Sequence, residues 1–219
     1  MKNKNRYFLA ELIGSCFLVM IIVGSGLMAE NLTNDTAVML IANTLATGAG
    51  LFVLITVFAD VSGAHFNPFV SIAMTITGKL KKKLLPFYIF AQVLGCLIGV
   101  ALANFFFEHQ IFELSTKSRD GVYIFVSEII ATLGLIMIIF GSMKSGKITV
   151  AASVGLYITA GYWFTSSTSF ANPAVAIART FTESFTGISY LNTPFYIFAE
   201  LIGMLIAVFI AKKLFLEKD

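Results

Sequence analysis

The sequence has few charged residues. Only 12% of its 219 residues are Asp, Glu, Lys or Arg, against about 25% in a typical soluble domain. Hydrophobic residues make up 58% of the chain, and the mean hydropathy is +0.87. This shortage of charge excludes an ordinary soluble domain and predicts an integral membrane protein. The net charge is only +3, and we expect no nucleic-acid partner.

Residues that perform metal and acid–base chemistry are also scarce. The chain has two histidines, His65 and His109, so a metal site with several His ligands is not available. Its two cysteines, Cys16 and Cys96, fall inside hydrophobic segments and are expected to be small buried residues. The sequence contains no nucleotide-binding motif and no catalytic constellation. We therefore expect neither an enzyme nor a bound cofactor.

Long hydrophobic segments, by contrast, occur six times. Several reach the about 20 residues that cross a bilayer as a helix, and the period-two alternation of a membrane barrel is absent. The first segment carries Glu11 and has no obvious cleavage site, which predicts a retained helix and not a signal peptide. The fifth segment is short. The six segments are 7–28, 36–58, 85–107, 122–143, 148–165 and 192–215.

The basic residues predict how these helices cross the membrane. They gather before the first and third segments, between the fourth and fifth, and at both ends of the chain. Six spans place these residues and both termini on one side, which the positive-inside rule assigns to the cytoplasm of a multi-pass cell-membrane protein. Twelve of the 15 Lys and Arg residues belong to this group: Lys2, Lys4, Arg6, Lys79, Lys81, Lys82, Lys83, Lys144, Lys147, Lys212, Lys213 and Lys218.

The two halves of the chain resemble each other. The phrase AELIGSCFLVM at 10–20 is similar to SEIIATLGLIM at 127–137. The phrase LPFYIFAQVLGCLIGVALA at 85–103 is similar to TPFYIFAELIGMLIAVFIA at 193–211. The order of segments is the same in each half, which indicates an internal repeat.

This repeat predicts a single domain, 1–219, made of two related halves at about 7–107 and 122–215. Each half contains three spans, an odd number, so the second half must be inverted in the membrane relative to the first. Within the repeat, Glu200 stands where the first half has Gln92.

A short polar motif occurs once in each half, inside hydrophobic sequence. Asn67-Pro68 and Asn172-Pro173 both predict a helix start, with Asn as N-cap and Pro at the first helical position. Each helix that follows is expected to have about 11 residues and a length of roughly 16 Å, about half of the bilayer core. Two half-helices that enter from opposite sides would meet by their N-termini near the midplane.

These features resemble the major intrinsic protein family, the aquaporins and aquaglyceroporins. The resemblance covers nearly the whole chain and includes the helices of Glu11 and Glu128, the phrase SGAHFNP at 62–68 and the phrase NPA at 172–174. It implies an all-α membrane protein with six transmembrane helices and two re-entrant half-helices in an inverted repeat. It also implies a homotetramer in membrane lipid, in which each subunit passes water and small neutral solutes passively.

The motif places Asn67 and Asn172, with Pro68 and Pro173, at the pore centre. The positive dipole ends of both half-helices meet there, and the Asn amides can donate hydrogen bonds to water or to a hydroxyl group. A cation meets both dipole ends and a desolvation penalty. The expected activity is therefore passive flow of small uncharged molecules.

The outer constriction departs from the family pattern. The family has an Arg directly after the second Asn-Pro-Ala, and here that place is Val175. By spacing, the other constriction positions fall on Thr47, Ala160 (or its neighbour Gly161) and Ser169. Water-selective members have an aromatic residue, a His and the Arg at three of these places. A wide constriction without them predicts passage of glycerol, urea-like solutes and neutral metalloid hydroxides.

Two further residues bear on the width of the pore. Arg179 lies four residues after Val175, on nearly the same helix face and about 6 Å further out. It is either a displaced filter charge in the external mouth or a rim Arg paired with Glu183 or with helix-terminal carbonyls. Phe69 stands where the family has Ala, and we expect its ring to pack away from the lumen.

Carboxylates inside the hydrophobic segments need an explanation, because they are costly there and by default functional. Glu11 and Glu128 are equivalent in the repeat, and the family uses such residues to accept donors from the non-helical loops. Asp60 is expected to line the inner vestibule together with His65. An ion- or proton-coupled transporter that uses Glu11, Asp60 or Glu128 remains the alternative function.

Overall fold

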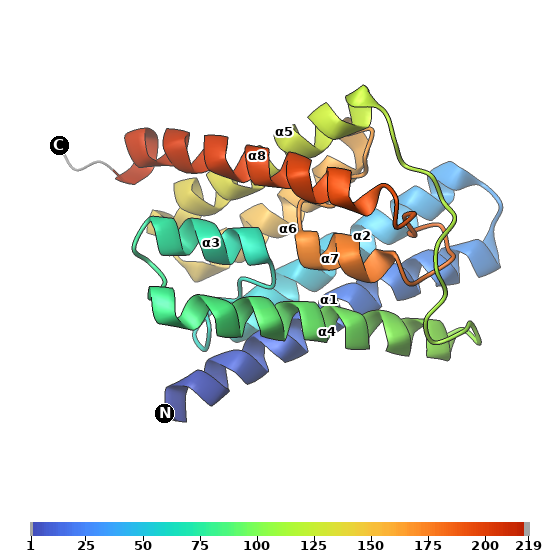
Figure 1. Cartoon of the computed structure of the whole chain (residues 1–219), viewed down its shortest axis with the longest axis horizontal. Helices are drawn as coiled ribbons and strands as arrows, with labels where there is room; N and C mark the ends of the chain where they lie inside the picture. The colour runs from blue at the N-terminus through green and yellow to red at the C-terminus, as the bar shows by residue number, and fades with distance from the viewer. Residues whose placement is uncertain (1, 217–219) are drawn as a thin grey trace.

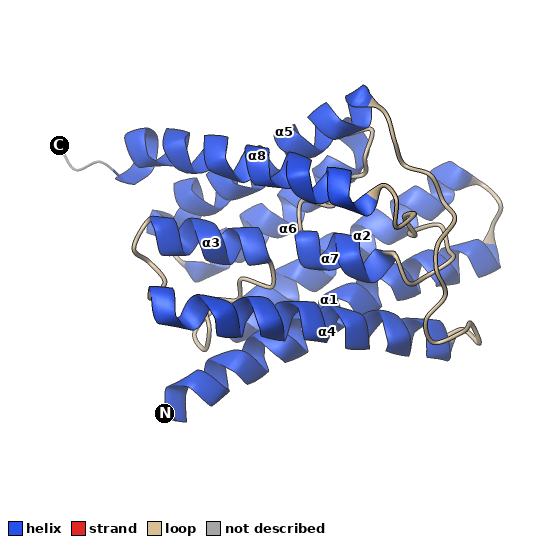
Figure 2. Cartoon of the chain, in the orientation of Figure 1, coloured by secondary structure: helices blue, strands red, loops and turns tan. Residues whose placement is uncertain are grey.

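The protein is a bundle of helices (Figure 1). The computed structural model describes residues 2–216, with side chains from residue 4. Lys218 and the side chain of Lys2, both counted in the predicted basic group, lie outside the described residues. Every regular element of the described part of the chain is helical, as Figure 2 shows.

All six hydrophobic segments form long helices, which confirms the predicted fold class. Five helical stretches are long and apolar enough to cross a membrane: Lys4–Leu32, Thr36–Phe58, Lys82–Phe106, Val122–Ser145 and Thr193–Leu216. The sixth helix, α6, has 18 residues and is more polar than these five. The long helices are α1 (Lys2–Leu32), α2 (Thr36–Phe58), α4 (Leu85–Phe106), α5 (Val122–Ser142), α6 (Lys147–Phe164) and α8 (Thr193–Ala211).

Short helical turns connect some of these helices. Two of them, η1 (Lys82–Leu84) and η2 (Met143–Ser145), are 3₁₀ turns at the start of α4 and the end of α5. A third, η3 (Lys212–Leu216), continues α8 as a π-helical turn.

The helices of each half pack closely in pairs. Helix α1 lies along α4, and α5 lies along α8. A Cβ atom added to Gly95 would lie 2.3 Å from the Leu12 carbonyl oxygen, and one added to Gly203 would lie 2.3 Å from that of Ile129. Glycine at these two repeat-related positions lets the helix backbones touch.

Two short helices, α3 (Pro68–Ile76) and α7 (Pro173–Arg179), lie end to end between α4 and α8 (Figure 1). They have 9 and 7 residues, fewer than the 11 predicted. Helix α3 stops because Gly78 turns the chain with a φ of 75°. Helix α7 stops because the N–H groups of Thr180 and Phe181 bond three residues back, which tightens the last turn.

The basic segments gather at one end of the bundle. The start of α1 and the end of η3 both lie there (Figure 1). The Lys4 Nζ atom lies 4.8 Å from the centre of the Phe87 ring, which joins the start of α1 to the start of α4. Lys147, at the start of α6, forms an ion pair with Asp60 after α2. This arrangement is the one that six membrane crossings require.

Candidate functional site

The two Asn-Pro motifs form the helix starts that the sequence predicts. The Oδ1 atom of Asn67 accepts from the backbone N–H groups two and three residues later, at 2.9 and 3.4 Å. The Oδ1 atom of Asn172 makes the same two bonds, at 3.1 and 3.4 Å. Pro68 and Pro173 occupy the first helical position in each case. Both caps therefore hold their amide groups in a fixed orientation.

The amide nitrogens of these two residues join the two halves of the molecule. Asn67 Nδ2 donates to the carbonyl oxygen of Ala171 at 2.7 Å, and Asn172 Nδ2 donates to that of Phe66 at 2.8 Å. The amides therefore do not keep both of their N–H groups for the lumen. Each amide instead uses one N–H on the opposite loop, and since an amide has two, the second remains for a solute.

The loops before the two caps have an unusual backbone. Ala64 and Phe66 have φ values of 51° and 49°, and their counterparts 105 residues later, Ser169 and Ala171, have 51° and 47°. Such left-handed conformations cost of order 1–3 kcal/mol for each residue with a side chain. They turn successive carbonyl groups in one direction, so the loops need other bonds to stabilise them.

Glu11 supplies these bonds in the first half. Its side chain is completely buried. Oε1 accepts from the Ser62 hydroxyl at 2.6 Å and from the His65 N–H at 3.0 Å. Oε2 accepts from the Phe66 N–H at 2.8 Å and from Gln92 Nε2 at 2.7 Å. Both oxygens of this carboxylate therefore accept hydrogen bonds from the first loop, and one of them also accepts from Gln92.

Glu128 and Glu200 act in the second half. Glu128 accepts from the backbone N–H groups of Phe170 and Ala171, both at 2.9 Å. Glu200 accepts from the N–H of Asn172 itself, at 2.9 Å. Both carboxyl groups are completely buried. The N–H groups of each loop point towards these acids, so the carbonyl oxygens of the loop point away from them.

Those carbonyl groups line a cavity of about 510 Å³. Within the described residues, no group donates a hydrogen bond to the carbonyl oxygens of Gly63, Ala64 or His65, and all three residues line this cavity. Water or a hydroxylated solute can therefore donate to them. This polar strip runs towards the two Asn amides.

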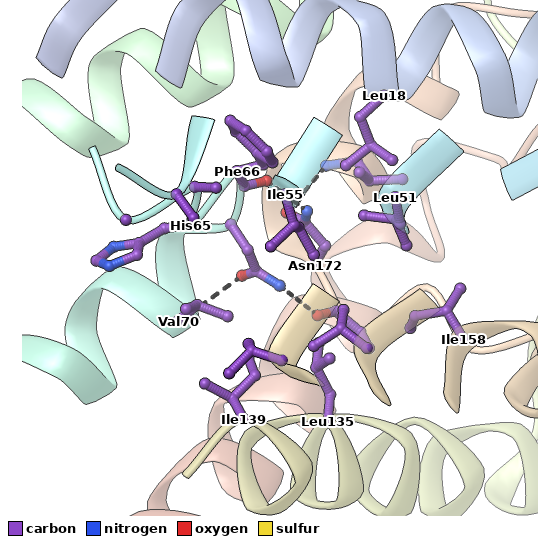
Figure 3. Close-up of a pocket in the computed structure, with 18 of the residues that line it drawn as sticks. Leu18, Leu51, Ile55, His65, Phe66, Val70, Leu135, Ile139, Ile158 and Asn172 are labelled. Carbon is purple, nitrogen blue, oxygen red and sulfur yellow. Dashed lines mark hydrogen bonds between the residues drawn. The ribbon is translucent and has the colours of Figure 1, made fainter. Parts of the chain in front are cut away.

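The cavity is continuous along the bundle. It reaches from Lys79 and Lys147 at the basic end, past Asn67 and Asn172, to Arg179. Figure 3 shows Asn172 near its middle. The wall around the polar strip is apolar, and the side chains labelled there include Leu18, Leu51, Ile55, Leu135, Ile139 and Ile158.

At the end opposite the basic segments, the structure brings together three of the four predicted constriction residues. Thr47, Ser169 and Val175 line the cavity. Ala160 does not, because it is exposed on the opposite face of α6. Its neighbour Gly161 is buried, and a Cβ atom added there would lie 2.7 Å from Ser169 Oγ. Gly161 packs against Ser169 but does not line the cavity, so neither of the two residues that the spacing offered lines it.

Two aromatic residues at this end were missed from the sequence. Tyr162 lines the cavity, and its hydroxyl lies 3.3 Å from Thr47 Oγ1. Phe170 lines it too, and its ring centre lies 3.5 Å from the guanidinium carbon of Arg179. Both residues are next to predicted constriction positions, which is the only sequence signal for them.

Arg179 is almost completely buried, with 2% of its surface exposed. Its Nε atom donates to the Thr186 carbonyl oxygen, and the guanidinium group reaches the cavity wall. Among the described residues, neither predicted pairing of a rim Arg, with Glu183 or with a helix-terminal carbonyl, is present, because Thr186 lies in the loop after α7. Glu183 instead accepts from the N–H and hydroxyl groups of Thr116, at 2.5 and 3.0 Å. The charge of Arg179 therefore faces the pore without a carboxylate partner at hydrogen-bond distance.

The linker between the halves adds two more cations to this end. Arg119 donates to the carbonyl oxygens of Gly187 and Phe185, at 2.8 and 3.0 Å. Burial lowers the pKa of the Lys117 ammonium to about 8, and the positive charges of Arg119 and Arg179 contribute to this shift. The carboxylates of Glu30 and Glu183 act on Lys117 in the opposite direction, so this end of the cavity carries charges of both signs.

At the inner end, His65 lines the cavity, and its Nδ1 atom lies 3.0 Å from Ser71 Oγ. Asp60 does not line it. It lies in the turn after α2, with 72% of its side chain exposed, where it pairs with Lys147. Lys147 is therefore the residue of this pair that reaches the cavity wall. Phe69 is buried in the core and does not line the cavity, so its predicted outward packing is confirmed.

A helical bundle of membrane-spanning length, with a continuous cavity and two half-helices that meet at its middle, defines a membrane channel. The chain belongs to the Major intrinsic protein family, whose profile matches residues 1–210. It is a passive transmembrane channel for water and small uncharged solutes. These findings give no support to the ion- or proton-coupled transporter.

Known relatives agree with this membership. The chain is 46% identical over 202 residues to the aquaglyceroporin AqpS of Rhizobium meliloti (strain 1021), covering 92% of this chain and 87% of that protein. It is 32% identical over 222 residues to a probable aquaporin TIP-type of Medicago truncatula, covering 95% and 86%. Its fold is similar to the X-ray structure of the aquaglyceroporin from Plasmodium falciparum, with a TM-score of 0.76, 22% identity, and 96% and 94% of the two chains covered.

Proposed function

We propose that the channel passes glycerol, urea-like solutes and neutral metalloid hydroxides as well as water. The observation that carries this proposal is the continuous cavity, with a strip of free carbonyl oxygens on one wall and apolar side chains on the others. A solute with several hydroxyl groups keeps its hydrogen bonds along the strip while its carbon side contacts the apolar wall. The relative named as an aquaglyceroporin supports the same class of solute.

At the centre, Asn67 and Asn172 act as the donors that a passing solute meets. Each holds its second amide N–H in place, because its Oδ1 caps a helix and its first N–H bonds the opposite loop. Pro68 and Pro173 start the two half-helices, whose positive ends repel cations. A solute accepts from the two amides and donates to the carbonyl strip on either side.

The outer constriction, in this proposal, is formed by Thr47, Ser169 and Val175, and Ala160 takes no part in it. These side chains are small or medium in size, which suits solutes larger than water. Arg179 supplies the filter charge one helical turn further out than in the family pattern. Its burial and its lack of a carboxylate partner at hydrogen-bond distance support this role.

The remaining residues support the path. Glu11 and Glu128 hold the two loops so that the carbonyl strip faces the cavity. His65 lines the inner vestibule, and Asp60 acts there only through its ion pair with Lys147. The protein carries out no chemical conversion of its solutes.

We also propose that the chain forms one domain of two inverted halves and assembles as a homotetramer. Large apolar side chains exposed on the bundle, among them Phe90, Phe105, Phe195 and Phe209, would be covered by membrane lipid and neighbouring copies. The gathered basic segments favour cytoplasmic N- and C-termini. Labelling of single cysteines added near residue 4 and in the 107–121 linker, from either side of intact cells, tests this orientation.

Stopped-flow light scattering of proteoliposomes tests the solute range. Vesicles with the protein should shrink fast under an impermeant osmolyte and then re-swell fast under glycerol. Fast shrinkage without re-swelling would mean that Arg179, Tyr162 and Phe170 together narrow the pore to water.

The filter role of Arg179 is tested by Arg179→Ala, with Arg119→Ala as the matched control. Both guanidinium groups contact the Phe170 ring, at 3.5 and 5.4 Å, but only that of Arg179 lines the main cavity. A charge about 4 Å from the path changes the energy of a cation by about 1–4 kcal/mol. Since about 1.4 kcal/mol is tenfold in rate, Arg179→Ala should raise cation leak by at least about fivefold. Equal leak in both variants would refute the role.

A further inference from the structure

Glu200 makes a contact with the pore that the family pattern does not explain. It lies on α8, its side chain is completely buried, and its Oε1 atom accepts from the N–H of Asn172 at 2.9 Å. Its other oxygen, Oε2, is buried and has no donor among the described residues. One oxygen therefore holds the pore Asn, while the other lacks the partner that a buried carboxylate needs.

The first half of the repeat shows what this position does. Gln92 occupies the equivalent place, and its Nε2 atom donates to Glu11 Oε2 at 2.7 Å. Glu128 is the counterpart of Glu11 and accepts two backbone N–H groups of the second loop in the same way. As α4, which carries Gln92, packs along α1, which carries Glu11, so α8, which carries Glu200, packs along α5, which carries Glu128. By symmetry, the group at position 200 should donate to this acid.

A carboxylate cannot donate, whereas a protonated carboxyl group has one O–H donor. Two carboxylates in contact and away from water do not both ionise, because their repulsion adds to the desolvation penalty. Glu128 accepts from two N–H groups of its loop, whereas Glu200 accepts from one, that of Asn172. Because fewer donors stabilise a charge on Glu200, the proton of the pair resides on Glu200.

We propose that Glu200 is a neutral carboxylic acid at neutral pH and donates its O–H to an ionised Glu128. One proton is then shared by the pair, and a single negative charge remains next to the second loop. Glu200 is a positioning residue: it accepts from Asn172 with one oxygen and donates to Glu128 with the other. An acid pair in the second half performs the task of the acid–amide pair Glu11 and Gln92 in the first.

Infrared spectroscopy of the reconstituted full chain tests the protonation state. At pH 7, about three units above the ordinary Glu pKa of about 4.3, the wild type should show the C=O stretch of a neutral carboxylic acid. Glu200→Gln should remove this band. Glu108→Gln, the same change at an exposed carboxyl group, should leave it unchanged. A spectrum in which Glu200→Gln removes no such band would overturn the proposal.

The positioning role is tested by comparing two variants at this residue. Glu200→Gln keeps an acceptor for Asn172 and a donor for Glu128, so it should fold and keep water flux within about twofold of the wild type. Glu200→Ala removes both and should lose most of the flux or fail to fold. If Glu200→Gln were as damaging as Glu200→Ala, an ionised Glu200 would be indicated and the proposal would be wrong. The infrared result needs no flux, so its failure is distinguishable from a failure of the proposed conduction.

Discussion

The contact between α1 and the first pore loop gives a sharp prediction for Gly14→Ala. A Cβ atom at Gly14 would lie 1.9 Å from Cε1 of Phe66, and carbon atoms pack at about 3.5–4.0 Å. The ring must therefore move by about 1.6 Å or more. It has little freedom to do so, because only 1% of Phe66 is exposed and the ring meets that of Phe58 edge to face at 6.0 Å.

The backbone of Phe66 is fixed as well. Its N–H donates to Glu11, and its carbonyl oxygen accepts from Asn172. Overpacking of this kind costs about 1–3 kcal/mol, and a lost hydrogen bond adds about 0.5–1.5 kcal/mol. We expect Gly14→Ala to lower the thermal midpoint by about 3–18 °C, from a total of about 1.5–4.5 kcal/mol at about 2–4 °C for each kcal/mol. The hydrogen bond from Asn172 to the Phe66 carbonyl oxygen joins the two loops, so its distortion should also lower the water flux severalfold.

Gly24→Ala is the matched control for this change. It is the same substitution on the same helix, but its added Cβ would meet nothing nearer than a Phe107 carbon at 3.6 Å, an ordinary contact. The two variants are compared by their thermal midpoint, followed by light scattering, and by their stopped-flow water flux. If Gly14→Ala matched Gly24→Ala in both measurements, the account of how Phe66 is held would be refuted.

Three other changes test separate parts of the structure. Gly203→Ala should lower the thermal midpoint of the detergent-solubilised protein, because its Cβ would lie 2.3 Å from the Ile129 carbonyl oxygen, a backbone atom that a rotamer change cannot move. A midpoint equal to that of the wild type would contradict this. Glu11→Ala leaves three donors without a partner, the Ser62 hydroxyl and the N–H groups of His65 and Phe66, at about 1–3 kcal/mol each. The yield of monodisperse protein should therefore collapse, whereas Glu108→Gln should not change it. Because the pKa of Lys117 is lowered from 10.5 to about 8, the unfolded chain binds more protons than the folded one between these two pH values. The free energy of unfolding should therefore rise with pH across this window. Lys117→Met should flatten the corresponding rise in thermal midpoint.

The sequence predicts the framework well because the framework rests on local signals. Hydrophobic segment length determines where the long helices lie, and Asn67 and Asn172 determine where the short helices begin through cap chemistry within three residues. The repeat then predicts that the two caps meet. Their reciprocal bonds to Ala171 and Phe66, which span 104 and 106 residues respectively, follow this expectation.

Details of the constriction depend on rotation and on long-range contacts, which spacing does not determine. On α6, Ala160 is exposed and Gly161 packs against Ser169, whereas Tyr162 lines the cavity. The stacking of Arg179 on Phe170 joins a half-helix to the loop before it, and no sequence motif predicts this contact.

Asp60 and the half-helices show the same limit. The distance of Asp60 from Asn67 along the chain predicted a vestibule residue, but the turn after α2 points its carboxylate to Lys147 instead. The lengths of α3 and α7 depend on how their last turns tighten, which hydrophobicity does not report.

The most direct test of the central claim is the concentration and temperature dependence of glycerol flux in proteoliposomes that carry no ion or proton gradient. A passive channel predicts flux that rises linearly with the glycerol gradient, has a low activation energy and does not change when a proton gradient is imposed. Saturable flux that needs such a gradient would contradict the account and indicate a coupled transporter that uses the buried acids Glu11 and Glu128.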